Sequence, residues 1–152
     1  MYSMRLGRYV AAPRAVVYRA LLDPQAVNAW RVPDDMHSEV HEWDARVGGR
    51  FRVSLTYDDA GRDGKSAGAT DTYHGHFAEL DPDRRVVEVI EFESADAALR
   101  EPMRVTTTLT DSGAGTEVTM QHDGIPDAVP PADNETGTRM ALANLARYVE
   151  AD

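Results

Sequence analysis

Five histidines carry the most obvious potential for acid–base or metal chemistry in this chain: His37, His41, His74, His76 and His122. His74 and His76 lie two residues apart in an alternating segment, so on a strand their imidazoles point to the same side, as two ligands of one metal would. A zinc site needs three or four protein ligands, and this pair lies on the face opposite Tyr73 and Phe77. We therefore predict surface histidines here, with no metal site and no cofactor.

The other candidates for chemistry are His122 and two glutamates. His122 shares a strand face with Val118 and Met120, so it is expected beside the interior, where a lone imidazole can act as a general base, orient a ligand or serve only structure. Glu88 and Glu91 lie in the segment 86–92, which is apolar on both faces, so either could point inward. An inward carboxyl among apolar groups has a raised pKa and becomes a candidate acid or base.

Composition excludes several classes of partner. The 152 residues contain 16 Lys and Arg against 26 Asp and Glu, a net charge of −10, with Lys65 as the only lysine. This balance argues against nucleic acid, which requires clustered cations, and it predicts a solvated acidic surface. Cysteine is absent, so no thiol chemistry is available. The sequence contains no run of about 18 apolar residues that could cross a membrane. The N-terminus lacks a secretory signal, which favours a cytoplasmic protein.

The elements that must position these residues follow from hydrophobic spacing. A short strand ends before Pro13, and helical patterns follow over residues 13–22 and from Asp23 and Pro24 to Trp30. Asp133 and Asn134 are expected to cap a last amphipathic helix over residues 135–150. Alternation predicts six strands between these helices, over residues 40–47, 51–57, 71–80, 86–92, 103–109 and 116–122.

Turn signals separate these strands. Gly48 and Gly49 predict one hairpin, and the residues 111–115 predict another. Residues 58–70 are predicted to be a mobile loop, whereas the pattern over 94–101 leaves loop and helical turn open. The order of elements favours a single α+β domain over residues 1–152, in which an antiparallel sheet of about seven strands curves around the last helix. Such an arrangement can enclose a cavity.

Several motifs, in this order, carry a resemblance to a known family. They are the segments from Asp44 to Phe51 and from Tyr73 to Val86, the segments 115–120 and 122–126, and Glu135-x-Gly137. With them the chain resembles the START-like (SRPBCC) superfamily and, within it, the homologues of the activator of the Hsp90 ATPase. The resemblance implies a helix-grip fold whose pocket holds apolar or amphipathic small molecules.

Two departures from the family pattern concern pocket size. Members commonly carry tryptophan where this chain has Thr138, and a second aromatic residue beside Trp30, where this chain has Ala29 and Arg31. Losing these large side chains is expected to enlarge or reshape the pocket.

The resulting hypothesis is a domain that binds a hydrophobic or amphipathic small molecule in an internal cavity. Its predicted lining comprises Trp30, Phe51, Val53, Leu55, Tyr57, Tyr73, Gly75, Phe77, Val105, Val118, Met120, His122, Met140, Leu142, Leu145 and Tyr148. The family name suggests a chaperone-linked or regulatory interaction as an alternative. A cyclase, dehydratase or hydrolase acting on a hydrophobic substrate is another, with His122, Glu88 or Glu91 as the catalytic group. A free strand edge makes a homodimer plausible.

Overall fold

The computed structural model describes residues 1–58 and 70–151. The chain runs through β1 (Tyr2–Val10), α1 (Arg14–Leu22), α2 (Pro24–Trp30), β2 (Met36–Trp43), β3 (Arg50–Tyr57), β4 (Thr70–Asp81), β5 (Arg85–Phe92), η1 (Ala97–Leu99), β6 (Met103–Ser112), β7 (Gly115–Ile125) and α3 (Pro131–Glu150). The predicted α+β order is therefore confirmed, and the open segment 94–101 contains one turn of 3-10 helix. The predicted mobile loop falls largely on residues 59–69, outside the described residues.

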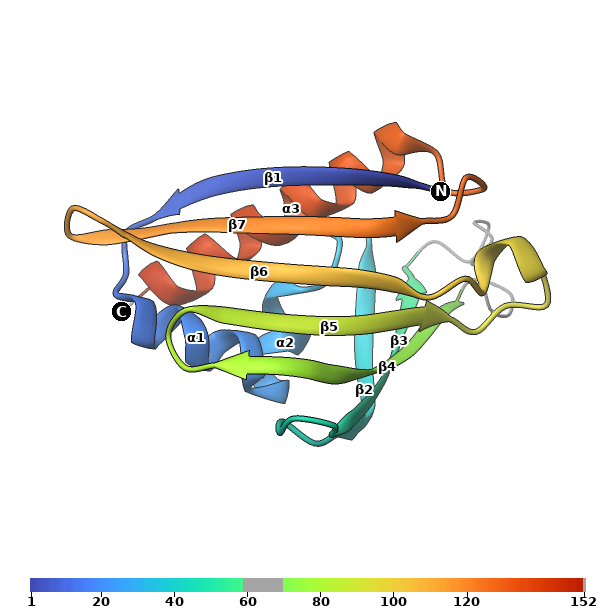
Figure 1. The fold of residues 1–152 in the computed structure, drawn as a ribbon, viewed down its shortest axis with the longest axis horizontal. Coiled ribbons are helices and arrows are strands. Elements are labelled where there is room, and N and C mark those ends of the chain that lie inside the picture. The colour runs from blue at the N-terminus through green and yellow to red at the C-terminus, as the bar shows by residue number, and fades with distance from the viewer. Residues whose placement is uncertain (59–69, 152) are drawn as a thin grey trace.

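All seven strands form one antiparallel sheet in the order β1-β7-β6-β5-β4-β3-β2. Figure 1 shows the sheet curving so that α3 lies along the face of β1, β7 and β6, while α1 and α2 close one end. The core lies between this concave face and the helices, as the helix-grip resemblance implied. β1 and β2 are the two edge strands of the sheet, and the homodimer stays a prediction.

The two short helices are fixed by local signals that the sequence displays. The Asp23 carboxylate accepts a hydrogen bond from the backbone N–H of Gln25 at 2.9 Å, and Pro24 occupies the first helical position. The indole N–H of Trp30 donates to the carbonyl of Ala20 at 2.8 Å, which ties the end of α2 to α1. Trp30 is 1% exposed and belongs to the packed core beneath these helices.

Two predicted elements are misplaced by several residues. The second strand was predicted over 40–47 but spans Met36–Trp43, because the chain turns from Asp44, whose carbonyl accepts the N–H of Arg46, to Gly48 at φ 81°. The last helix begins at Pro131, ahead of the predicted cap. Proline presets the helical φ there, so Asp133 lies in the first turn and makes no cap.

An aromatic cluster fills the interior beneath β3 and β4. The rings of Phe51 and Phe77 lie 5.1 Å apart, and Trp43 contacts both, at 5.6 Å from Phe51 and 5.4 Å from Phe77. Gly75, between them in the sheet, is required by close approach: a Cβ atom would lie 2.0 Å from the carbonyl oxygen of Val89 and 2.9 Å from Cζ of Phe51. This end of the core is therefore solid.

Within the described residues, no helix combines the length and the apolar character needed to cross a membrane.

Candidate functional site

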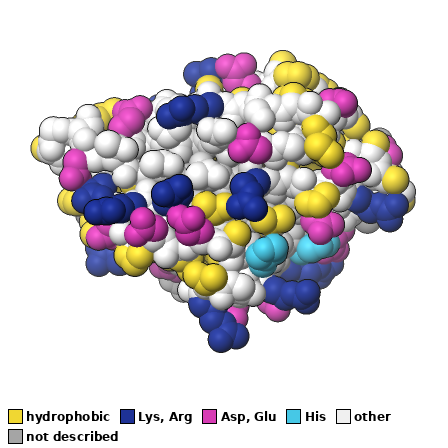
Figure 2. All heavy atoms as spheres, in the orientation of Figure 1, with side chains coloured by type: hydrophobic (Ala, Val, Ile, Leu, Met, Phe, Trp, Pro, Cys, Tyr) yellow, Lys and Arg dark blue, Asp and Glu magenta, His cyan; other side chains and the backbone are white. Residues whose placement is uncertain are grey.

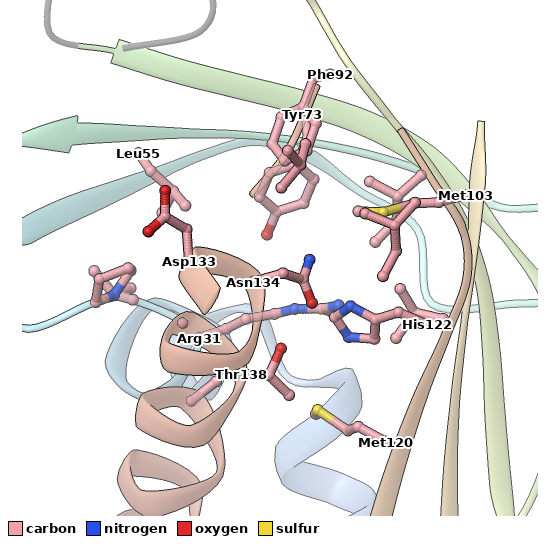
Figure 3. Close-up of a pocket in the computed structure, with 18 residues that line it drawn as sticks. Arg31, Leu55, Tyr73, Phe92, Met103, Met120, His122, Asp133, Asn134 and Thr138 are labelled. Carbon is pink, nitrogen blue, oxygen red and sulfur yellow. The ribbon is translucent and has the colours of Figure 1, made fainter. Parts of the chain in front are cut away.

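A cavity of about 220 Å³ lies between the concave face of the sheet and the N-terminal half of α3. Its walls come from the segment after α2, from strands β3 to β7 and from α3 (Figure 3). The lining residues are Arg31, Val32, Pro33, Leu55, Tyr73, Ile90, Phe92, Met103, Val105, Met120, His122, Ile125, Val129, Asp133, Asn134, Gly137, Thr138 and Ala141. Asn144 anchors one wall, because its side-chain amide donates to the carbonyl of Val32 at 2.9 Å. The lining is mostly apolar, with a few polar groups among it.

The structure brings five of the predicted lining residues to this cavity: Leu55, Tyr73, Val105, Met120 and His122. Most of the others are buried, but in the solid part of the core or beside it, and do not line the cavity: Trp30, Phe51, Val53, Phe77, Val118, Leu142 and Leu145. Gly75, Tyr57 and Met140 are only partly buried, Tyr148 is 42% exposed on α3, and none of these four lines it. The alternating pattern therefore predicted which strand residues face the interior, but not which of them line the cavity and which lie in the packed core.

Three buried polar atoms at the cavity have no hydrogen-bond partner. They are the Tyr73 hydroxyl, Nδ1 of His122 and Oδ1 of Asn134, and they are the only such side-chain atoms among the described residues. All three residues line the cavity, which they reach from β4, β7 and α3 (Figure 3). Buried polar groups in native proteins are almost always paired with protein, water or ligand, so their clustering makes this cavity the candidate binding site.

Arg31 and Glu88 form a buried ion pair beside these atoms. Nη1 of Arg31 donates to both carboxylate oxygens of Glu88, at 2.9 and 2.8 Å, and the two side chains are 16% and 4% exposed. Glu88 shares the inward face of β5 with Ile90 and Phe92, since residues two apart on a strand point the same way. Of the two glutamates that the sequence left open, Glu88 therefore faces inward, and it is paired.

The environment keeps His122 neutral at pH 7. Burial, followed by the nearby Arg31 cation, lowers its pKa from 6.5 to about 4, and the side chain of Asn134 and the carboxylate of Asp123 only partly oppose this. Burial likewise raises the pKa of Tyr73 to about 12, although Arg31 lowers it. Both side chains therefore face the cavity in their uncharged forms.

This shift predicts a specific loss of stability in acid. Below pH 6.5 His122 binds a proton in the unfolded chain, whereas in the folded chain it stays unprotonated down to about pH 4. Because the unfolded state binds more protons, the free energy of unfolding falls as the pH falls from 6.5 to about 4. We expect the loss to reach about 2 kcal/mol by pH 5. Urea unfolding at pH 7 and pH 5 measures it, and His122→Gln should remove it, whereas His76→Gln, at an exposed histidine, should not. An equal loss in the His122→Gln variant would contradict the assignment.

The unpartnered hydroxyl of Tyr73 predicts a second stability effect. Removing a buried polar group that has no partner removes its desolvation cost, so Tyr73→Phe is expected to raise the free energy of unfolding by about 1 kcal/mol. Tyr148→Phe makes the same chemical change at an exposed site and should have no effect beyond about 0.5 kcal/mol. Chemical denaturation of both variants without added ligand decides the matter. Destabilisation by Tyr73→Phe would mean that the hydroxyl has a partner in the folded protein.

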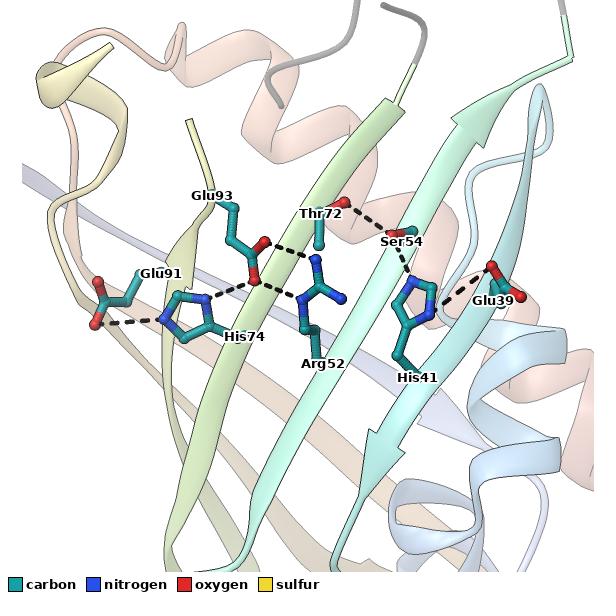
Figure 4. Close-up of polar contacts among 8 residues, drawn as sticks. All are labelled: Glu39, His41, Arg52, Ser54, Thr72, His74, Glu91 and Glu93. Carbon is teal, nitrogen blue, oxygen red and sulfur yellow. Dashed lines mark hydrogen bonds and ion pairs between the residues drawn. The ribbon is translucent and has the colours of Figure 1, made fainter. Parts of the chain in front are cut away.

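The outer face of the sheet holds the remaining histidines and Glu91. His74 bonds Glu93 at 2.9 Å and lies 3.9 Å from Glu91, while Arg52 donates to both oxygens of Glu93 (Figure 4). Hydrogen bonding from Arg52 is the main reason that the pKa of Glu93 falls to about 2. Figure 2 shows acidic and basic side chains interspersed over this face of the molecule. Residues 1–58 and 70–151 contain no cluster of three or more potential metal ligands.

Sequence reasoning missed several lining residues, and for some of them a signal existed. Period two places Ile90 and Phe92 on the same strand face as Glu88, although it does not say which face of this segment is the inner one. Asn134, Thr138 and Ala141 recur at intervals of four and three, which places them on one face of α3. Arg31 carried no signal, because its role depends on Glu88, a residue 57 positions away.

Comparisons with known proteins agree with this geometry. The family described as Activator of Hsp90 ATPase homolog 1-like protein matches residues 11–150. A crystal structure of a protein from Chromobacterium violaceum is 35% identical, with a TM-score of 0.88 over 99% of this chain and 98% of that chain. A solution structure of an AHSA1-like protein from Aeromonas hydrophila is 22% identical, with a TM-score of 0.76 over 99% and 93% of the two chains, and shows the shared fold. No curated protein matches the chain.

Proposed function

Since the chain belongs to the Activator of Hsp90 ATPase homolog 1-like family, we propose that it is a binding domain whose cavity receives a hydrophobic or amphipathic small molecule. One observation carries the proposal. Every buried side-chain atom of the described residues that lacks a hydrogen-bond partner belongs to a residue lining one largely apolar cavity. Small-molecule sites have this composition, with apolar walls and a few convergent polar groups.

The size of the cavity is sufficient for a small organic ligand. An apolar cavity of about 150 Å³ in another protein admits benzene, so a cavity of about 220 Å³ has room for a larger aromatic molecule. Leu55, Phe92, Met103 and Met120 supply flexible or aromatic contact surface. Methionine in particular adapts to ligands of different shape.

The same geometry argues against the catalytic alternative. Both oxygens of Glu88 accept hydrogen bonds from Arg31, so this carboxylate is not available as an acid or base. With a pKa of about 4, His122 is uncharged at neutral pH and is a poor proton acceptor. Glu91 does not line the cavity and lies beside His74.

Thermal denaturation in the presence of 2-methylnaphthalene tests the proposal. This probe is apolar and uncharged, and it exploits only the walls of the cavity. We expect a saturable rise in melting temperature, which corresponds to about 2.7 kcal/mol when the free probe is at a hundred times its Kd. The absence of a shift with this probe and with a library of lipids and polyketide-like aromatic molecules would overturn the proposal.

A further inference from the structure

The cavity offers a ligand both a hydrogen-bond donor and a hydrogen-bond acceptor. The Tyr73 hydroxyl belongs to a residue that is 6% exposed, and it can donate or accept. Oδ1 of Asn134 is an acceptor only, and Nδ1 of His122, which is near enough to the Asn134 side chain for its pKa to be affected, takes either role according to its tautomer. In Figure 3 these side chains approach the interior from three different elements.

No uncompensated cation accompanies this polar set. Arg31 is the only cation among the lining residues, and the carboxylate of Glu88 already neutralises it through two short hydrogen bonds. The exposed carboxylate of Asp133 also lines the cavity and repels anions. A cationic ligand would lose its hydration in this largely apolar space, and the anion among the lining residues that is not already paired, Asp133, is exposed to solvent.

We infer that the polar end of the ligand is an uncharged hydroxyl group, so that the site selects an apolar molecule bearing an alcohol or phenol over the corresponding carboxylate or amine. This inference rests on the proposed function. A hydroxyl is both donor and acceptor, so one group can accept from Tyr73 and donate to Asn134. A carboxylate offers no donor, and an ammonium offers no acceptor.

Four probes with one naphthalene body separate these possibilities: 2-naphthol, 2-methylnaphthalene, 2-naphthoate and 2-naphthylmethylammonium. Their dissociation constants are measured at pH 7 by calorimetric or fluorescence titration of the intact protein. We expect 2-naphthol to bind about tenfold more tightly than 2-methylnaphthalene, the effect of one or two net hydrogen bonds. The two ions should bind at least about tenfold more weakly than 2-naphthol.

A variant cycle then identifies the contact. Tyr73→Phe should weaken 2-naphthol about tenfold and change 2-methylnaphthalene by less than about twofold, because only the first probe can use the hydroxyl. Asn134→Ala, at the first turns of α3, should show the same selective loss and serves as a second test should Tyr73→Phe fold poorly. Tyr148→Phe, exposed and away from the cavity, should leave all four constants unchanged.

The outcomes distinguish the inference from the function on which it rests. Equal affinity for 2-naphthol and 2-methylnaphthalene would overturn the inference but not the proposal that the cavity binds apolar molecules. This result is expected if water already forms hydrogen bonds with Tyr73 and Asn134. Tighter binding of 2-naphthoate would also overturn it, since Arg31 would then be available to an anion. Failure of all four probes, together with the library of lipids and polyketide-like aromatic molecules, would overturn the proposed function itself.

Discussion

Replacing Glu88 by alanine is expected to lower the free energy of unfolding by about 3–5 kcal/mol. The change leaves the guanidinium of Arg31, whose side chain is 16% exposed, without its anion. A buried charge without a partner costs several kcal/mol, far more than the loss of an exposed ion pair. Urea denaturation at pH 7 measures the effect.

Glu91→Ala on the same strand is the matched control. Its carboxylate lies 3.9 Å from His74 on the outer face and is 42% exposed, so we expect a change within about 0.5 kcal/mol. The double variant Arg31→Met and Glu88→Leu replaces both charges by apolar groups and should fall within about 1 kcal/mol of the original protein. A loss of less than about 1 kcal/mol for Glu88→Ala alone would show that Arg31 finds water in place of Glu88.

Thr138→Trp is expected to weaken the binding of 2-methylnaphthalene at least about a hundredfold, which corresponds to about 2.7 kcal/mol. Thr138 is 6% exposed and lines the cavity from α3, so an indole ring at this position occupies the space that the probe needs. Titration of the probe, together with circular dichroism to verify folding, measures the result.

Arg139→Trp introduces the same residue at the next position of the helix, on its exposed side, and should leave the dissociation constant unchanged. Retention of full affinity in Thr138→Trp would place the bound probe elsewhere in the molecule. It would then contradict the proposed site even if the protein binds apolar molecules.

The edges of the elements show where sequence reasoning loses accuracy. The helix after Asp23 could be predicted because proline, the capping carboxylate and the apolar spacing all act within a few residues. The start of α3 was misplaced because Pro131 and the pair Asp133 and Asn134 both resemble helix starts, and the helix begins at the proline. The end of β2 at Trp43 is fixed by the turn that follows it.

The histidines and glutamates show the same difference between what local spacing predicts and what depends on distant residues. Alternation correctly predicted that His74 and His76 turn away from the interior, since the period of a strand is a local property. It could not choose between Glu88 and Glu91, because the segment is apolar on both faces. The choice depends on Arg31, which reaches Glu88 from another element.

The sequence by itself determined the α+β class, the order of the elements, the acidic composition and the inward or outward direction of side chains on clearly alternating strands, since each depends on composition or on short-range spacing. Only the tertiary structure decided where the interior is solid and where it is hollow. That outcome depends on the summed volumes of side chains from distant elements: Trp43, Phe51 and Phe77 fill one end, whereas Thr138 and Ala141 face the sheet at the other. The cavity, which is the proposed ligand site, lies where these side chains do not fill the space between sheet and helix.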